Sequence, residues 1–265
     1  MKSKFFNVNL TPDLINGVVG TMIQSDKTDL PFSARDILFD WQAVDVPRGA
    51  NMLRSVSAYV MGEDGGLAAN QPIYLIFAKT INNVAPTTLG VVNAAVTAGW
   101  DLPLHYIGAM KLSGAGGEGA ISGPTFGNIM VSTMGMDDGA QAGWGLPMVL
   151  DLEPTSGTNV GYDKLYVAGI AGGAFDFSTG VLANYTSGAP SVDTTTSITV
   201  DTVDARKCFQ VGDVIYVHDV NTALGTVKSV AENTITLEAN NGAAVANNDE
   251  IVNANPIKIR LGFEY

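Results

Sequence analysis

The pattern in this chain that most resembles a chemical motif is a glycine-rich stretch, Gly114-Ala-Gly-Gly-Glu-Gly119, whose spacing matches a dinucleotide-binding fingerprint. That fingerprint works only where a strand leads into the loop and a helix begins at its end, because the backbone N–H groups must face the pyrophosphate. Here Gly123-Pro124 follow at once and break the required helix. We therefore expect no nucleotide site and no cofactor.

Carboxylates are the second candidate, since paired acids can hold calcium or act as an acid–base pair. They occur at Glu63-Asp64 and Asp137-Asp138. A calcium loop needs several oxygen ligands at alternating positions and a glycine at its sharp turn. Asp219-Val-Asn221 begins such a pattern, but Leu224 stands where the glycine is needed. These acids are interpreted as solvated turn residues, and no metal site is expected.

The remaining reactive side chains are two histidines and one cysteine. His105 and His218 lack the close spacing of a zinc-binding pair, and no Gly-x-Ser-x-Gly nucleophile motif occurs. Cys208 has no histidine closer in sequence than His218, so we interpret it as a buried structural thiol. A single cysteine also excludes an intrachain disulfide. The prediction is a protein that is not an enzyme.

Aromatic residues leave one binding function open. A sugar site is typically lined by tryptophan, tyrosine or phenylalanine, and the chain offers Trp41, Trp100, Trp144, Tyr74 and Phe77. Such residues more often anchor cores and interfaces. Recognition of a glycan therefore stays an alternative beside a structural role.

Composition narrows the class of partner. The chain has 265 residues, a net charge of −12, and 15% charged against 46% hydrophobic residues, which indicates a folded protein. Fourteen basic residues scattered among 26 acidic ones do not form a phosphate-binding surface, so no nucleic acid is expected. No apolar run approaches the ~20 residues of a membrane span, and the N-terminus lacks the apolar core of a secretory signal. We expect a protein made in a cytoplasm, without a membrane partner.

Short alternating or apolar runs predict an all-β fold with a sandwich, jelly-roll-like, as its main domain. Low charge and 30 glycines fit many tight turns. The β-region begins near Ile37, and the predicted sandwich comprises 35–185 plus 256–265. Its expected strands are 53–60, 73–78, 104–112, 128–132, 146–152 and 164–170.

A small barrel-like module is predicted at 198–253, after a linker at 186–197. Sharp turns, such as Gly212-Asp213 and Asn240-Asn241-Gly242, separate five short strands there. Closure into a barrel would hide the strand edges. Beyond Pro256, residues 257–263 alternate cleanly between apolar and polar side chains. This predicts that the last strand returns to the sandwich, so that the module is an insertion.

The N-terminal segment, 1–34, is predicted to be an arm. It shows little periodicity, yet it carries apolar side chains that need cover from this chain's core or from another subunit. The residues expected to bind a partner are Phe5, Phe6, Leu10, Leu14 and Ile15.

One stretch resembles a known group of proteins. Pro47-Arg48-Gly49-Ala50 and Leu53-Arg54-Ser55-Val56, then residues 73–79 and 85–90, are similar to virion structural proteins of marine tailed bacteriophages. The resemblance covers about residues 45–100 and carries no functional residues with it. It implies a β-rich capsid decoration protein on the outside of a phage shell. The implied partners are the major capsid protein or other virion proteins and further copies of the chain, as a homo-oligomer.

The resemblance favours a non-enzymatic virion structural protein, located at the capsid surface and made in the host cytoplasm. The alternative is a receptor- or glycan-binding surface module of the phage fibre or adhesin type, in which 198–253 would contact the host.

Overall fold

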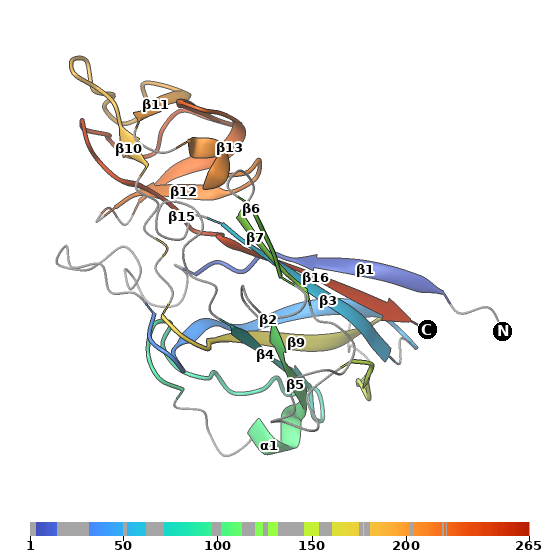
Figure 1. Ribbon diagram of the computed structural model, residues 1–265. Helices are drawn as coiled ribbons and strands as arrows, with labels where there is room; N and C mark the ends of the chain where they lie inside the picture. The colour runs from blue at the N-terminus through green and yellow to red at the C-terminus, as the bar shows by residue number, and fades with distance from the viewer. Residues whose placement is uncertain are drawn as a thin grey trace.

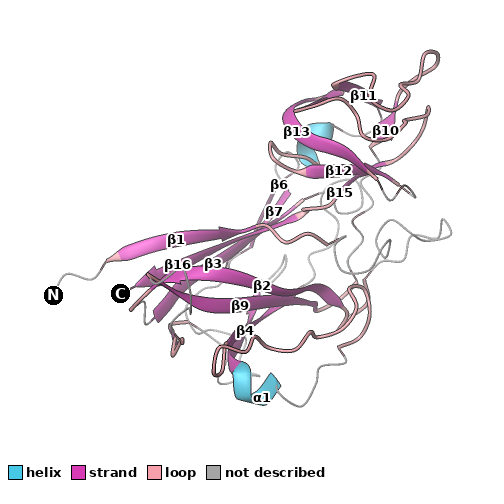
Figure 2. Cartoon of the chain, turned by 180° about the vertical axis from the view of Figure 1, so that it is seen from behind, coloured by secondary structure: helices cyan, strands magenta, loops and turns pink. Residues whose placement is uncertain are grey.

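The computed structural model describes residues 4–14, 32–49, 52–61, 72–96, 102–112, 120–123, 127–131, 146–153, 161–174, 177, 181–201, 204–218, 220 and 222–264. Figures 1 and 2 show two β-units, a sandwich and a smaller module at one of its ends. The only helical elements of these residues are α1 (Leu102–His105) and η1 (Ala205–Lys207). The predicted all-β fold, a sandwich with a barrel-like module, is confirmed.

The first sheet of the sandwich is antiparallel and contains both ends of the described chain. Its order is β1-β16-β3-β7-β6, and β8 pairs with the N-terminal end of β3. The strands are β1 (Phe5–Leu10), β16 (Ile257–Glu264), β3 (Met52–Val60), β7 (Gly127–Val131), β6 (Ala120–Gly123) and β8 (Met148–Val149). Apolar residues alternate along β16, as the sequence predicted, because one face of the strand covers the core.

The second sheet has the order β2-β9-β4-β5. Its strands are β2 (Ile37–Pro47), β9 (Tyr162–Ala171), β4 (Ile73–Lys79) and β5 (Tyr106–Leu112). Large side chains that fill the core between the sheets include Phe39, Phe77 and Phe263, all fully buried. The ring of Phe39 lies over Gly169 of β9, where a Cβ atom would approach the ring to 2.2 Å. A glycine is therefore needed at that position.

The module is a curled antiparallel sheet in the order β10-β11-β14-β13-β12-β15. Its strands are β10 (Leu182–Ala183), β11 (Ser197–Asp201), β14 (Thr234–Leu237), β13 (Ala223–Ala231), β12 (Val214–Val217) and β15 (Ile251–Asn253). Leu182 bridges to Glu250, and Ile251 N donates to Val181 O at 2.9 Å, so the first strand reaches the last. These contacts nearly close the barrel around a core of its own.

The observed boundary of the module differs from the predicted one. β10 lies within the predicted sandwich segment but pairs with β11 of the module. The segment predicted as a linker is also fastened to the module, because Thr194 N and Thr195 N donate to the buried side chain of Asn241. Polar composition suggested a linker, but these residues are held by hydrogen bonds to a distant turn.

The insertion is confirmed, whereas the N-terminal segment is more than an arm. β16 pairs with both β1 and β3, so the chain returns to the sandwich after the module. Residues Phe5–Leu10 form the edge strand β1 of the first sheet. The sequence pattern did not predict this strand, because β16, with which β1 pairs, lies about 250 residues further along the chain.

Candidate functional site

The reactive residues singled out in the sequence do not gather into a catalytic or metal site within the described chain. His105 is buried and its Nδ1 lies 2.8 Å from Lys79 O. In the described part, no group of three or more His, Cys, Asp or Glu side chains could hold a metal ion. Cys208 is fully buried, and burial raises the pKa of its thiol to about 12, which keeps it protonated and unreactive.

Several predicted candidates fall outside the described residues. They are Gly114–Gly119, Glu63, Asp64, Asp137, Asp138, Asp219, Asn221, Trp100 and Trp144. Beyond the glycine-rich stretch, the chain continues into the strand β6. Of the aromatic candidates, Phe77 is a core residue, and Trp41 packs beside Ile37 and donates its Nε1–H to Thr87 O at 2.9 Å.

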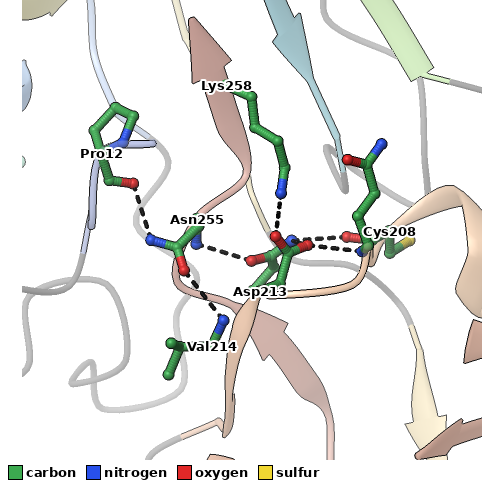
Figure 3. Close-up of polar contacts among 8 residues, drawn as sticks. Pro12, Cys208, Asp213, Val214, Asn255 and Lys258 are labelled. Atoms are coloured by element: carbon green, nitrogen blue, oxygen red, sulfur yellow. Dashed lines mark hydrogen bonds and ion pairs between the residues drawn. The ribbon is translucent and has the colours of Figure 1, made fainter. Parts of the chain in front are cut away.

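The most elaborate polar site lies where the module meets the sandwich, and its centre is Asp213. This residue follows Gly212 in the predicted turn before β12, and its side chain is 0% exposed. One carboxylate oxygen accepts hydrogen bonds from Gln210 N and from Asn253 Nδ2, both at 2.8 Å. The other forms an ion pair with Lys258 Nζ on β16 (Figure 3). A charge from the sandwich therefore compensates a buried charge of the module.

Two asparagines extend this network. Asn253 Nδ2 also donates to Cys208 O at 2.9 Å, and Asn253 Oδ1 accepts from Asn255 N at 2.8 Å. Asn255 Oδ1 accepts from Val214 N, while its Nδ2 donates to Pro12 O at 3.2 Å. Figure 3 shows Asn255 between Pro12 and Val214, where it links the N-terminal segment to the module. Both asparagines are buried and hydrogen-bonded, as buried polar groups in native structures generally are.

Backbone bonds reinforce the same junction. Leu14 N donates to Ala254 O and Ala254 N donates to Val214 O, each at 2.9 Å. Met61 N donates to Pro256 O at 2.9 Å. The N-terminal segment, the end of β3 and the start of β12 thus converge on residues 254–256.

Tyr59 brings β3 into the junction, opposite Lys258 in the sheet register. Burial raises the pKa of its hydroxyl, a hydrogen bond with the Gln210 side chain lowers it, and the charge of Asp213 raises it further. The hydroxyl therefore stays protonated at neutral pH and contacts the module.

Chemically, this arrangement couples two units. A buried ion pair contributes little net stability, but removal of one partner leaves an uncompensated charge that costs about 3–5 kcal/mol. The network therefore favours one orientation of the module over others. The sequence pattern predicts the turn at Gly212-Asp213 but not this network, since Asn253 and Asn255 precede Pro256 in what reads as an ordinary polar turn.

The five residues predicted to bind a partner have different environments. Leu10 and Leu14 belong to the sandwich core, which corrects the expectation that they face another protein. Phe6 is partly buried and stacks on Phe263, with ring centroids 5.0 Å apart. Phe5 is 69% exposed, and Ile15 lies outside the described residues.

Phe5 belongs to a row of residues on the outer face of the first sheet, at the end far from the module. The register places Phe5 opposite Glu264, Glu264 opposite Met52, and Met52 opposite Val149. Directly opposite residues of antiparallel strands share a face. Val149 is 68% exposed, so the row presents an apolar side chain at each end. We call these four residues the distal row.

Comparison with protein-family models, curated proteins and solved structures found no match to this chain. Among the described residues, no helix is long and apolar enough to cross a membrane.

Proposed function

We propose that this protein is a non-enzymatic virion structural protein, a capsid decoration protein that binds the outside of a phage shell and neighbouring copies of itself. The observation that carries the proposal is the difference between the two ends of the first sheet. One end of β16 is fixed to the module through Lys258, and the other end, at Glu264, lies in the distal row, whose end residues Phe5 and Val149 are exposed. Such a protein can dock by one end and display the module at the other.

The proposal draws further support from the resemblance at residues 45–100 and from the acidic composition. An excess of negative charge keeps a protein soluble at high concentration and directs it toward basic partners. In a decoration protein, the distal row would contribute apolar contacts at Phe5 and Val149, on either side of the Glu264 carboxylate, which forms an ion pair with Arg54. Exposed residues of that row include Phe5 and Val149.

The test is occupancy of shells that lack the protein. We expect Phe5→Ser combined with Val149→Ser to lower occupancy at least about tenfold, since a few central apolar residues usually dominate an interface. Val211→Ser is the matched control, because Val211 is 68% exposed but lies in the module. Full occupancy by the double variant would exclude the distal row as the anchor. Failure of the wild-type protein to bind any shell would overturn the proposed function.

A receptor- or glycan-binding role for the module is the second candidate. It is favoured by the module's own core and by its place at the end of the sandwich (Figure 1). Saturable binding of the full chain to one sugar class on a glycan array would favour this role. A substitution on the module, such as Val192→Asp, should then weaken that binding while the double variant of the distal row leaves it unchanged.

A further inference from the structure

β1 is the edge strand of the first sheet. It pairs with β16 on one side, and no described strand lies on its other side. Figures 1 and 2 both show β1 at the outer margin of the sandwich. An edge strand directs the N–H and C=O groups of alternate residues away from its single neighbour, which makes it a template for another strand.

The edge strand on the same side of the second sheet, β2, is protected in a way that β1 is not. β2 pairs irregularly with β9, with register shifts after Ile37 and after Phe39. It also carries Asp40, Asp45 and Pro47, and charges, proline and bulges all hinder pairing at an edge. β1 has an unbroken register and contains no charged residue or proline.

The inner face of β1 also leaves apolar surface uncovered. Phe6 and Val8 pack against the sandwich core but are only partly buried, whereas Leu10 in the same strand is buried. The outer face presents Phe5, Asn7 and Asn9, all exposed. A further strand beside β1 would cover the sides of Phe6 and Val8 that the core does not reach.

We propose that β1 pairs with β1 of a second copy of this chain, antiparallel and around a two-fold axis at Asn7. In this register, Asn7 lies opposite Asn7 of the partner subunit, Phe6 opposite Val8 of the partner subunit, and Phe5 opposite Asn9 of the partner subunit. The two partly buried residues Phe6 and Val8 therefore meet each other across the axis, and the two sheets continue into each other. Because the strand is uncharged, no like charges oppose each other, so the strand is complementary to itself, as a two-fold interface requires.

The inference rests on the proposed function only in that both involve contact between copies, and it specifies the contacting strand. The two can fail separately. A monomeric variant that still fills its sites on shells would leave the virion role intact. A dimer that binds no shell would leave this inference intact.

The first test is disulfide cross-linking of variants of the full chain that each carry one added cysteine. Paired residues lie about 4.5–5.5 Å apart between Cα atoms, within reach of a disulfide. Asn7→Cys should therefore cross-link under mild oxidation. Asn9→Cys is the matched control, because its two copies would lie about 13 Å apart along the strands. The native Cys208 is buried and its pKa is raised to about 12, so it does not compete.

The second test is sedimentation of charge variants. Asn7→Lys places two ammonium groups opposite each other across the axis and should weaken dimerisation about fivefold. Ser55→Lys is the control, since Ser55 lies in the same cross-strand row, two strands in from the edge. A dimer that Asn7→Lys weakens and Ser55→Lys does not would support the inference. A wild-type protein that stays monomeric, or an Asn9→Cys variant that cross-links faster than Asn7→Cys, would overturn it.

Discussion

The two units of this protein differ in the edges of their β-sheets. In the module, the bridge from Leu182 to Glu250 brings the first and last strands together, so the curled sheet nearly closes on itself. Among the described strands, the two sheets of the sandwich stay open, and their edge strands β1 and β2 lie near each other. Closure removes pairing edges, whereas open edges have to be protected or used. Under the proposed function, contacts between copies would belong to the sandwich and display would belong to the module.

The junction between the two units holds them together by more than the covalent chain. Two covalent crossings alone would let the module pivot, but Asp213 and Lys258 place one buried ion pair across the boundary. The polar groups around that pair are hydrogen-bonded to one another and to the backbone of the N-terminal segment. The same module could therefore be displayed in one direction on every copy.

The largest effect is expected from breaking this junction. Lys258→Met keeps the apolar stem but leaves the buried Asp213 without its counter-ion, which should lower the free energy of unfolding by about 3–5 kcal/mol. Chemical denaturation measures the loss, and separate transitions for the two units would show that their coupling is lost.

Two further variants test whether the burial of Asp213 causes the loss of stability in Lys258→Met. Lys164→Met removes a solvent-exposed pair with Asp45 and should cost at most about 1 kcal/mol. The double variant Asp213→Asn with Lys258→Met should recover part of the loss, because no charge is then left buried. Equal losses for Lys258→Met and Lys164→Met would contradict a special role of the junction.

Packing within the sandwich should give the next largest effect. In Gly169→Ala, the added Cβ atom would lie 2.2 Å from the buried ring of Phe39, so the ring or the strand must move. Overpacking of this kind typically costs about 1–3 kcal/mol. Gly161→Ala, with no atom within 4 Å of its Cβ, serves as the control in the same thermal melt. A shift no larger than that of the control would mean that this core is loosely packed.

In the module, Asn241 should be the corresponding weak point. Its side chain accepts from Thr194 N and Thr195 N and donates to Ser191 O and Ala243 O. Asn241→Ala removes the partner of four backbone groups, of which that of the buried Ala243 is left without access to water, and should cost about 1–3 kcal/mol. Hydrogen exchange should show faster exchange at residues 191–197 and little change in the sandwich. Faster exchange in both units would contradict their separate cores.

The smallest effect at neutral pH concerns Cys208. Its pKa is raised to about 12 by burial, against 9.0 for the exposed thiol. The unfolded chain therefore loses this proton first. Stability should not depend on the thiol below pH 9 and should fall between pH 9 and about 12. A Cys208→Ala variant should lack this component in denaturation measured across that range. Identical pH profiles of the variant and the wild-type protein would show that the thiol is accessible when folded.

Sequence patterns located most of the strands because those strands are governed by local rules. The predicted 73–78 became β4 (Ile73–Lys79), and the turn at Gly212-Asp213 leads into β12, as expected. Alternation at 257–263 indicated a half-buried strand beyond the module. Each of these signals lies within a few residues, since side-chain alternation and turn chemistry are properties of adjacent positions.

The site was harder to foresee because its members come from distant parts of the chain. Asp213, Asn253 and Lys258 look like ordinary turn and surface residues, and only the folded chain brings them together. The segment 186–197 looked like a linker for the same reason, since its hydrogen bonds go to Asn241. In the N-terminal segment, this chain's own core covers Leu10 and Leu14, whereas Phe5 is exposed. The local sequence could not say which of these apolar side chains the core would cover.

The sequence alone determined that this is an all-β chain, acidic and rich in turns, with a module inserted before a final returning strand. Hydrophobic alternation and turn residues carry that information locally. The tertiary structure decided that Leu10 and Leu14 belong to this chain's own core, that an ion pair with the buried Asp213 holds the module, and that β1 pairs with only one of the described strands. These features depend on which strands become neighbours, and that is set by the packing of the whole chain around its two cores.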